Sequence, residues 1–315
     1  MKTQLFKFMP LVILVIIALT ACTPNQKKEQ NDFSPKLQAL SLSGDSLFSA
    51  SPSEKVIKNY KLAKTIYDAN TKNPDNLIWL GRWTAYTGDY LGAIKIFTKG
   101  IEQFPNDARF YRHRGHRYIS IRKFNDAIVD LEYAMKLIED QPDVVEPDGM
   151  PNAMNQPISS LHSNIRYHLG LAYYLTHQLD KALEVYKTDI NLATNDDQIV
   201  STSHWLYMTL RLLGHNEEAE KVLEPITREL NIFENFDYHQ LLLLYKGELI
   251  DTDLLGEDYT VNVSEGMAYG IANWYFYNGQ TDKAKTMLEK ILSGKQWASF
   301  GYIAAEADYL EYFKL

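Results

Sequence analysis

The sequence repeats a pattern of small and large apolar residues at a spacing of 34 residues. Gly81 recurs as Gly115, and Phe97 recurs as Leu131. Small residues let two antiparallel helices approach closely, and large apolar residues fill the space to the next pair. From residue 56 onward, the sequence has this helical pattern and lacks strand-like alternation of apolar and polar residues. The repeat therefore predicts stacked helical hairpins.

The clearest copy is LGRWTAYTGDYLGAIKIFTKGIEQFP, residues 80–105, which closely resembles the tetratricopeptide repeat (TPR) family. Weaker copies follow at residues 169–186, 206–223 and 271–288. Single or degenerate units are expected at 53–72, at 236–256 and in the closing helix GYIAAEADYLEYF, which would cap the last repeat. The resemblance implies an all-α, right-handed TPR-type solenoid that forms one domain over residues 52–315.

One insertion breaks the period. Gly115 and Gly170 are 55 residues apart, 21 more than one repeat. The extra residues lie at about 140–163 and include four of the eleven prolines, so this stretch is not helical throughout. Its proline and methionine content favours a packed loop that covers one face. The alternative is a tolerated surface insertion.

The first 22 residues, MKTQLFKFMPLVILVIIALTAC, have the layout of a lipoprotein signal peptide. Two lysines precede an apolar run that is too short to span a bilayer. Leu19-Thr20-Ala21-Cys22 resembles the bacterial lipobox, so we expect cleavage after residue 21 and lipid, such as palmitate, on Cys22. Cys22 is the single cysteine, which excludes an intramolecular disulfide.

Residues 22–51 are polar after the cysteine and are interpreted as the lipidated residue and a flexible tether. The residue after Cys22 is Thr23 rather than aspartate, which favours the outer membrane. We therefore expect a lipid-anchored protein of the bacterial cell envelope. The chain has a formal net charge of −8, which argues against nucleic acid as a partner because such binding depends on neutralising phosphates.

The stretch YRHRGHRY, residues 111–118, is the most basic part of this acidic chain. At 100° per residue, it divides among three stripes of one helix. In the TPR register the stripe of Arg112 and His116 faces the groove, while His113 faces elsewhere. His113 and His116 are three residues apart, but this register turns them to different faces, so we do not expect a metal site.

The same register predicts a basic and aromatic partner-binding groove. Its predicted lining is Arg82, Tyr86, Arg109, Arg112, His116, Tyr167, Tyr174, His204, Arg211, Tyr269 and Asn273. Arginine pairs in a bidentate way with carboxylates, and tyrosine supplies a rigid surface with a polar tip. Such a groove fits an acidic or extended peptide. The alternative is that these arginines pair with acids of the same chain.

The sequence contains no HExxH, GxSxG, phosphate-binding glycine loop or CxxC. We therefore expect no enzyme activity, no cofactor and no catalytic residues. The lipobox, the tether and the repeats together resemble bacterial TPR lipoproteins.

A more distant resemblance is to the family of the envelope adaptor called new lipoprotein I. It is carried by HWLYMTLRLLG, LLLYKGELIDTDLL, YGIANWYFYNGQTDKAKTML and AAEADYLEY. This resemblance implies a homodimeric, non-enzymatic scaffold that binds protein partners. The competing hypothesis is an accessory subunit of an uptake or secretion system that binds a saccharide or a peptide.

Overall fold

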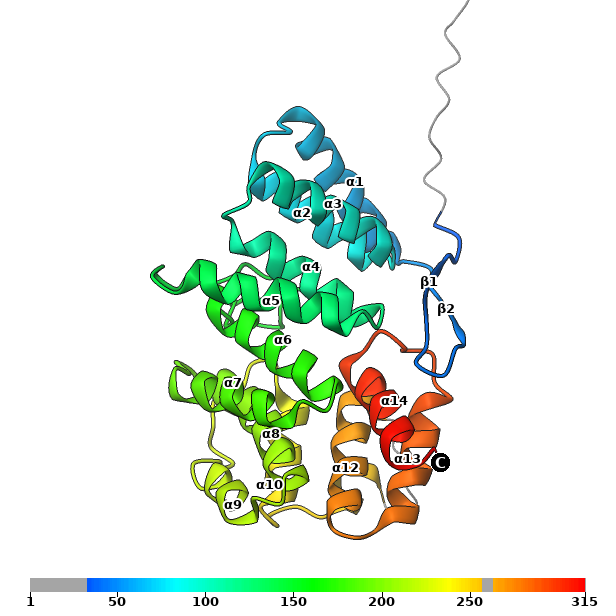
Figure 1. Cartoon of the computed structure of the whole chain (residues 1–315), viewed down its shortest axis with the longest axis vertical. Coiled ribbons are helices and arrows are strands. Elements are labelled where there is room, and N and C mark those ends of the chain that lie inside the picture. The colour runs from blue at the N-terminus through cyan, green and yellow to red at the C-terminus, as the bar shows by residue number, and fades with distance from the viewer. Residues whose placement is uncertain (1–32, 257–262, 315) are drawn as a thin grey trace, which may run out of the picture. The chain divides into compact units, whose positions relative to one another are not determined.

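The computed structural model describes residues 33–256 and 263–314. These residues form antiparallel helical hairpins, and successive hairpins lie side by side (Figure 1). The hairpins are α2 (Pro74–Tyr86) with α3 (Tyr90–Gln103), α4 (Ala108–Ser120) with α5 (Phe124–Ile138), α6 (Leu161–Leu175) with α7 (Leu179–Asn191), α8 (Asp196–Leu212) with α9 (Asn216–Leu223), and α12 (Glu265–Tyr277) with α13 (Thr281–Leu292). This confirms the predicted all-α, TPR-type solenoid.

The glycines of the repeat mark the closest approach of the two helices in a hairpin. A Cβ atom on Gly115 would lie 2.8 Å from the side chain of Leu131, and one on Gly170 would lie 2.5 Å from the ring of Tyr186. Both distances are shorter than van der Waals contact allows. The small residues in the sequence pattern are therefore required by helix packing.

The additional helices also match the sequence analysis. Helix α1 (Glu54–Ala69) precedes the first hairpin, and α10 (Phe236–Tyr245) and α11 (Asp251–Leu255) form the degenerate pair. The last helix, α14 (Phe300–Tyr312), packs against α12 and α13 and also contacts α6. Residues 301–308 of α14 are all buried, so this helix is enclosed by its neighbours. Within the described residues, no helix is long and apolar enough to cross a membrane.

The tether prediction needs a correction between residues 33 and 51. Strands β1 (Leu37–Leu40) and β2 (Ser46–Phe48) pair in an antiparallel β-hairpin. The hairpin is bound to the repeats, because the backbone N–H of Leu42 donates to Glu306 Oε1 at 2.8 Å and Trp297 Nε1 donates to the carbonyl of Phe48 at 2.8 Å. The predicted signal peptide and Cys22 lie outside the described residues.

The insertion lies between α5 and α6, at residues 139–160, and is called the insertion segment below. It is not helical, as its prolines predict, and Val145 and Ser160 pair in an isolated β-bridge. Ser160 then caps α6, because its side chain accepts from the backbone N–H of Ser163 at 3.2 Å. The segment is held at both ends and packs on the repeats.

Candidate functional site

The predicted groove corresponds to the side of the solenoid formed by the first helices of the hairpins, α2, α4, α6, α8 and α12. We call it the first-helix face. The chain's own segments cover much of this face. The insertion segment packs over α2 and α4, and α14 packs against α6 and α12. Both covering segments bring carboxylates with them.

Glu146 of the insertion segment is the acid that occupies the basic part of this face. Its carboxylate lies 3.2 Å from Arg112 Nη2 and 3.1 Å from His113 Nε2, and all three side chains are buried. Burial alone would raise the pKa of Glu146, but Arg112 and His113 outweigh it and lower that pKa. Arg112 is therefore already paired within the chain.

The other basic residues of the predicted groove also have internal partners. Arg82 Nη1 donates to the carbonyl of Pro147 at 2.7 Å. The insertion segment also covers Tyr86, since a Cβ atom on Gly149 would collide with its ring. Arg109 pairs with Asp107 at 2.6 Å and Asp75 at 2.7 Å. Arg109 and Arg112 therefore pair with acids of the same chain, as the alternative predicts, whereas Arg82 donates to a backbone carbonyl.

His116 lies beneath the start of α14. Its ring centroid is 4.3 Å from that of His168 and 5.2 Å from that of Phe300. Burial, followed by the charge of Arg117, lowers the pKa of His116 well below its usual value. This histidine is therefore a neutral packing residue.

Tyr174, Tyr269 and Asn273 form a buried hydrogen-bond network around Asp308 of α14. The hydroxyl groups of Tyr174 and Tyr269 are 2.6 Å apart, and Tyr269 donates to Asp308 Oδ2 at 2.6 Å. Asn273 Nδ2 donates to Tyr174 at 2.8 Å. The prediction that these side chains line an open groove is wrong, because α14 fills the space in front of them.

His204 and Arg211 are also engaged inside the protein. His204 is fully buried and stacks on Tyr238, with 4.4 Å between ring centroids. The guanidinium of Arg211 lies 4.5 Å from the ring centroid of Tyr277 and donates to Asn278 Oδ1 at 3.0 Å. Among the predicted groove residues, Tyr167 alone lines the cavity described next.

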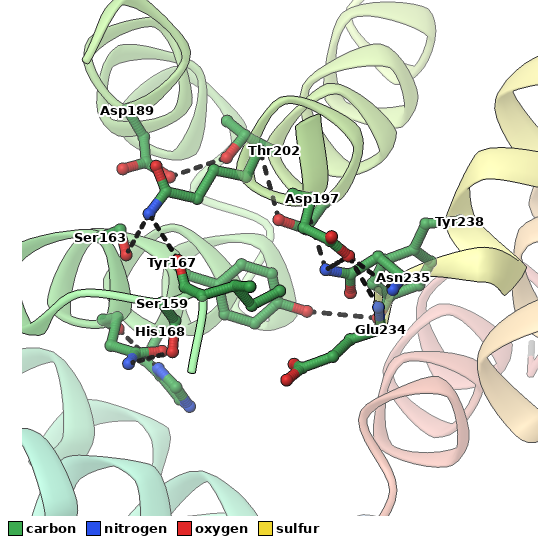
Figure 2. Close-up of a pocket in the computed structure, with 14 residues that line it drawn as sticks. Ser159, Ser163, Tyr167, His168, Asp189, Asp197, Thr202, Glu234, Asn235 and Tyr238 are labelled. Atoms are coloured by element: carbon green, nitrogen blue, oxygen red, sulfur yellow. Dashed lines mark hydrogen bonds between the residues drawn. The ribbon is translucent and has the colours of Figure 1, made fainter. Parts of the chain in front are cut away.

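A polar cavity of about 250 Å³ remains on the first-helix face between α6 and α8 (Figure 2). We call it the central cavity. It is lined by Ile158, Ser159, Ser163, Asn164, Tyr167, His168, Asp189, Asp197, Gln198, Ser201, Thr202, Glu234, Asn235 and Tyr238. The lining combines the N-terminal halves of α6 and α8 with Asp189 of α7, the insertion segment and the start of α10.

Two of the three carboxylates in the lining are fixed by strong internal bonds. Asp189 accepts from Arg166 Nε at 2.7 Å and from the Thr202 hydroxyl at 2.8 Å. Asp197 accepts from the backbone N–H groups of Phe233 at 2.8 Å and Asn235 at 2.8 Å. The bonds to Asp197 hold the chain that leads into α10 against α8. They thereby position the third carboxylate, which lies between Phe233 and Asn235.

Glu234 is that third carboxylate, and its side chain extends into the central cavity (Figure 2). It accepts one hydrogen bond, from Asn152 Nδ2 of the insertion segment at 2.8 Å. Burial raises the pKa of Glu234, the hydrogen bond from Asn152 offsets part of this rise, and the nearby charges of Asp148 and Asp197 add to it. Glu234 is exposed, so its carboxylate is accessible to a donor or a cation from solution. The lining itself contains neither lysine nor arginine.

Glu234, Asp197 and Asn235 are cavity residues that the repeat pattern does not predict. They lie between the recognised repeats, so the repeat register assigns them no face. The one local signal is the pair Asp196 and Asp197 in the first turn of α8, a common place for acids at a helix start. In the part of the chain that the structure describes, there is no group of three His, Cys, Asp or Glu side chains that could hold a metal ion.

The family comparison matches "Tetratricopeptide repeat" to residues 267–293. None of the curated proteins matches the chain. Among solved structures, YrrB, described as a TPR protein with an unusual peptide-binding site, is 17% identical, with 80% of this chain and 98% of that chain covered and a TM-score of 0.42. A tetratricopeptide repeat protein from Parabacteroides merdae ATCC 43184 is 14% identical, with 82% and 80% covered and a TM-score of 0.45. The matched repeat coincides with the hairpin of α12 and α13.

Proposed function

We propose that this protein, whose helical hairpins form a tetratricopeptide-type solenoid, is a lipid-anchored interaction scaffold of the bacterial envelope. It binds an extended segment of a protein partner at the central cavity. The observation that supports this proposal is a cavity rich in hydrogen-bonding groups, into which the Glu234 carboxylate extends with one hydrogen bond. Solenoids present such surfaces to extended ligands.

The charge of the partner segment follows from the charges that line the central cavity. Arg109 and Arg112 are paired with carboxylates of the same chain, so they are not free to bind an acidic peptide. The central cavity instead holds carboxylates, of which Glu234 is exposed and accepts the fewest hydrogen bonds from the described residues. The proposed segment therefore places a lysine or arginine side chain at Glu234.

The anchoring part of the proposal rests on the sequence. The lipobox-like Leu19-Thr20-Ala21-Cys22 would attach lipid at Cys22. Substitution Cys22→Ser should move the protein from the membrane fraction to the soluble fraction of its native host. Retention of the variant in membranes would contradict lipid anchoring and leave the peptide site to be tested separately.

The peptide site is tested by selecting random peptides on the full chain in detergent micelles. The selected peptides should be rich in lysine or arginine, and Glu234→Gln should weaken the best of them by about tenfold. Glu229→Gln is the matched control, because Glu229 is exposed and lies outside the cavity. Selection of acidic peptides, or equal binding by the Glu234→Gln variant, would overturn the proposal.

A further inference from the structure

A second cavity, of about 500 Å³, lies between α1, α2 and the insertion segment. We call it the tryptophan pocket. It is lined by Asn59, Leu62, Ala63, Ile66, Asn76, Trp79, Trp83, Asp148, Gly149 and Pro151. Its volume is within the range of about 300–1,000 Å³ that is typical of ligand pockets. It does not share a lining residue with the central cavity.

The pocket is open because α1 is a single helix before the first hairpin. Within the described residues, α1 packs on α2 and has no preceding helix on its other side. Leu62 and Ile66 of α1, which line the pocket, are 56% and 46% exposed. Trp79 and Trp83 of α2 are half-buried beside them. The architecture thus leaves an apolar wall with two indole rings accessible to a ligand.

Two polar side chains of the pocket have unpartnered atoms, whereas Asn76 donates to the carbonyls of Ile66 and Asn70. Asp148 Oδ2 is buried and receives no hydrogen bond, which is costly for a carboxylate oxygen. The side chain of Asn59 has no hydrogen-bond partner among the described residues either. The Asp148 side chain as a whole is half-buried and lines the pocket, so a ligand there can donate a hydrogen bond to its carboxylate.

The surrounding charges decide what kind of donor fits. The guanidinium of Arg82 lies over the ring of Trp79, 4.4 Å from its centroid. Burial raises the pKa of Asp148, and the charge of Arg82 offsets part of that rise. A cationic ligand would meet Arg82, and an anionic ligand would meet Asp148. The complementary ligand is therefore a neutral molecule that donates hydrogen bonds.

We propose that the tryptophan pocket binds a neutral saccharide, with a pyranose ring against Trp79 and Trp83 and a hydroxyl group donating to the Asp148 carboxylate. The C–H face of a pyranose carries a small positive charge and is attracted to the negative face of an indole ring. The remaining hydroxyl groups reach Asn59, whose amide donates and accepts. This site is separate from the proposed peptide site, since Asp148 lines one cavity and Glu234 lines the other.

The test is calorimetric titration of the full chain in detergent micelles with maltotriose, xylotriose and N,N′-diacetylchitobiose. At least one probe should bind, and Asp148→Asn and Trp83→Ala should each weaken it by about tenfold or more. Asp140→Asn is the matched control, because Asp140 is exposed in the same segment and outside the pocket. Glu229→Gln should leave saccharide binding unchanged, because Glu229 is exposed and lies outside both cavities.

Trp83→Ala removes a partly buried ring, so the folding of this variant is checked by circular dichroism. If Trp83→Ala unfolds, the comparison of wild type with Asp148→Asn decides the test. The proposal is overturned if none of the three probes binds at millimolar concentration. It is also overturned if a probe binds equally well to the wild-type chain and to Asp148→Asn, because the saccharide would then occupy another surface.

Discussion

Arg112 of α4 and Glu146 of the insertion segment form a buried ion pair, with 3.2 Å between Nη2 and Oε2. The exposed fractions of the two side chains are 10% and 8%. The pair joins a helix of the repeat to a segment that the repeat pattern does not include. It explains how an acidic chain accommodates its most basic stretch without an external acidic ligand.

Removing the acid of this pair should be costly. In Glu146→Gln the buried charge of Arg112 loses its partner, so we expect a loss of about 3 kcal/mol in the free energy of unfolding, measured by urea denaturation. Replacing both residues, in Arg112→Met/Glu146→Met, should recover much of that loss. Asp140→Asn is the exposed control. Equal stability of Glu146→Gln and wild type would show that the ion pair does not hold the segment.

Arg122 combines a strained backbone with a long-range ion pair. Its φ is 63°, and its Nε donates to Glu306 Oε2 of α14 at 2.8 Å. Arg122→Ala should lose about 3 kcal/mol, because Glu306 is then left as an unpaired buried charge. Arg122→Gly should lose about 1 kcal/mol less than the alanine variant, since glycine adopts positive φ without strain. Thermal unfolding of both variants measures the difference, and alanine as stable as glycine would exclude strain at this position.

The buried histidines predict a loss of stability in acid. Burial lowers the pKa of His204 to about 3, below the value of about 6.5 expected in the unfolded chain. Between these values the unfolded state binds a proton that the folded state does not. Stability should therefore be complete above about pH 6.5 and should fall as the pH decreases toward 3.

His204 alone should contribute a slope of about 1.4 kcal/mol per pH unit across that window. Urea midpoints of His204→Phe between pH 7.5 and 4.5 should show a shallower dependence than wild type. Ser203→Ala is the control, because it alters a buried neighbour that does not titrate. Parallel curves for wild type and His204→Phe would contradict a neutral buried His204.

The close approach of paired helices is tested by the same substitution at two glycines. A methyl group on Gly170 would meet the ring of Tyr186 at 2.5 Å, so Gly170→Ala should lose about 2 kcal/mol through overpacking. At Gly266, in the first turn of α12, the nearest atom would be 3.7 Å away. Gly266→Ala should be neutral or slightly stabilising because alanine favours the helix. Thermal unfolding that ranks the two variants in the opposite order would rule out this explanation.

Much of the helical architecture can be predicted from the sequence because its causes are local. Gly81, Ala93 and Phe97 recur at one spacing, and each contacts residues of its own hairpin or the next. The register of the repeat also predicts which helix comes first in each hairpin. The β-hairpin at residues 37–48 was not predicted, because its contacts are to Leu91, Trp297 and Glu306, which are distant in sequence.

The sequence by itself therefore determined the repeat, its hairpins and the position of the insertion, since these depend on spacing and on side-chain size. The tertiary structure alone decided which polar side chains are free. Glu146, Glu306 and Asp308 reach their partners from segments outside the local repeat, and Arg122 and Glu306 are 184 residues apart. A buried charge is stable when a partner charge lies next to it, and that proximity is a property of the folded chain rather than of any repeat.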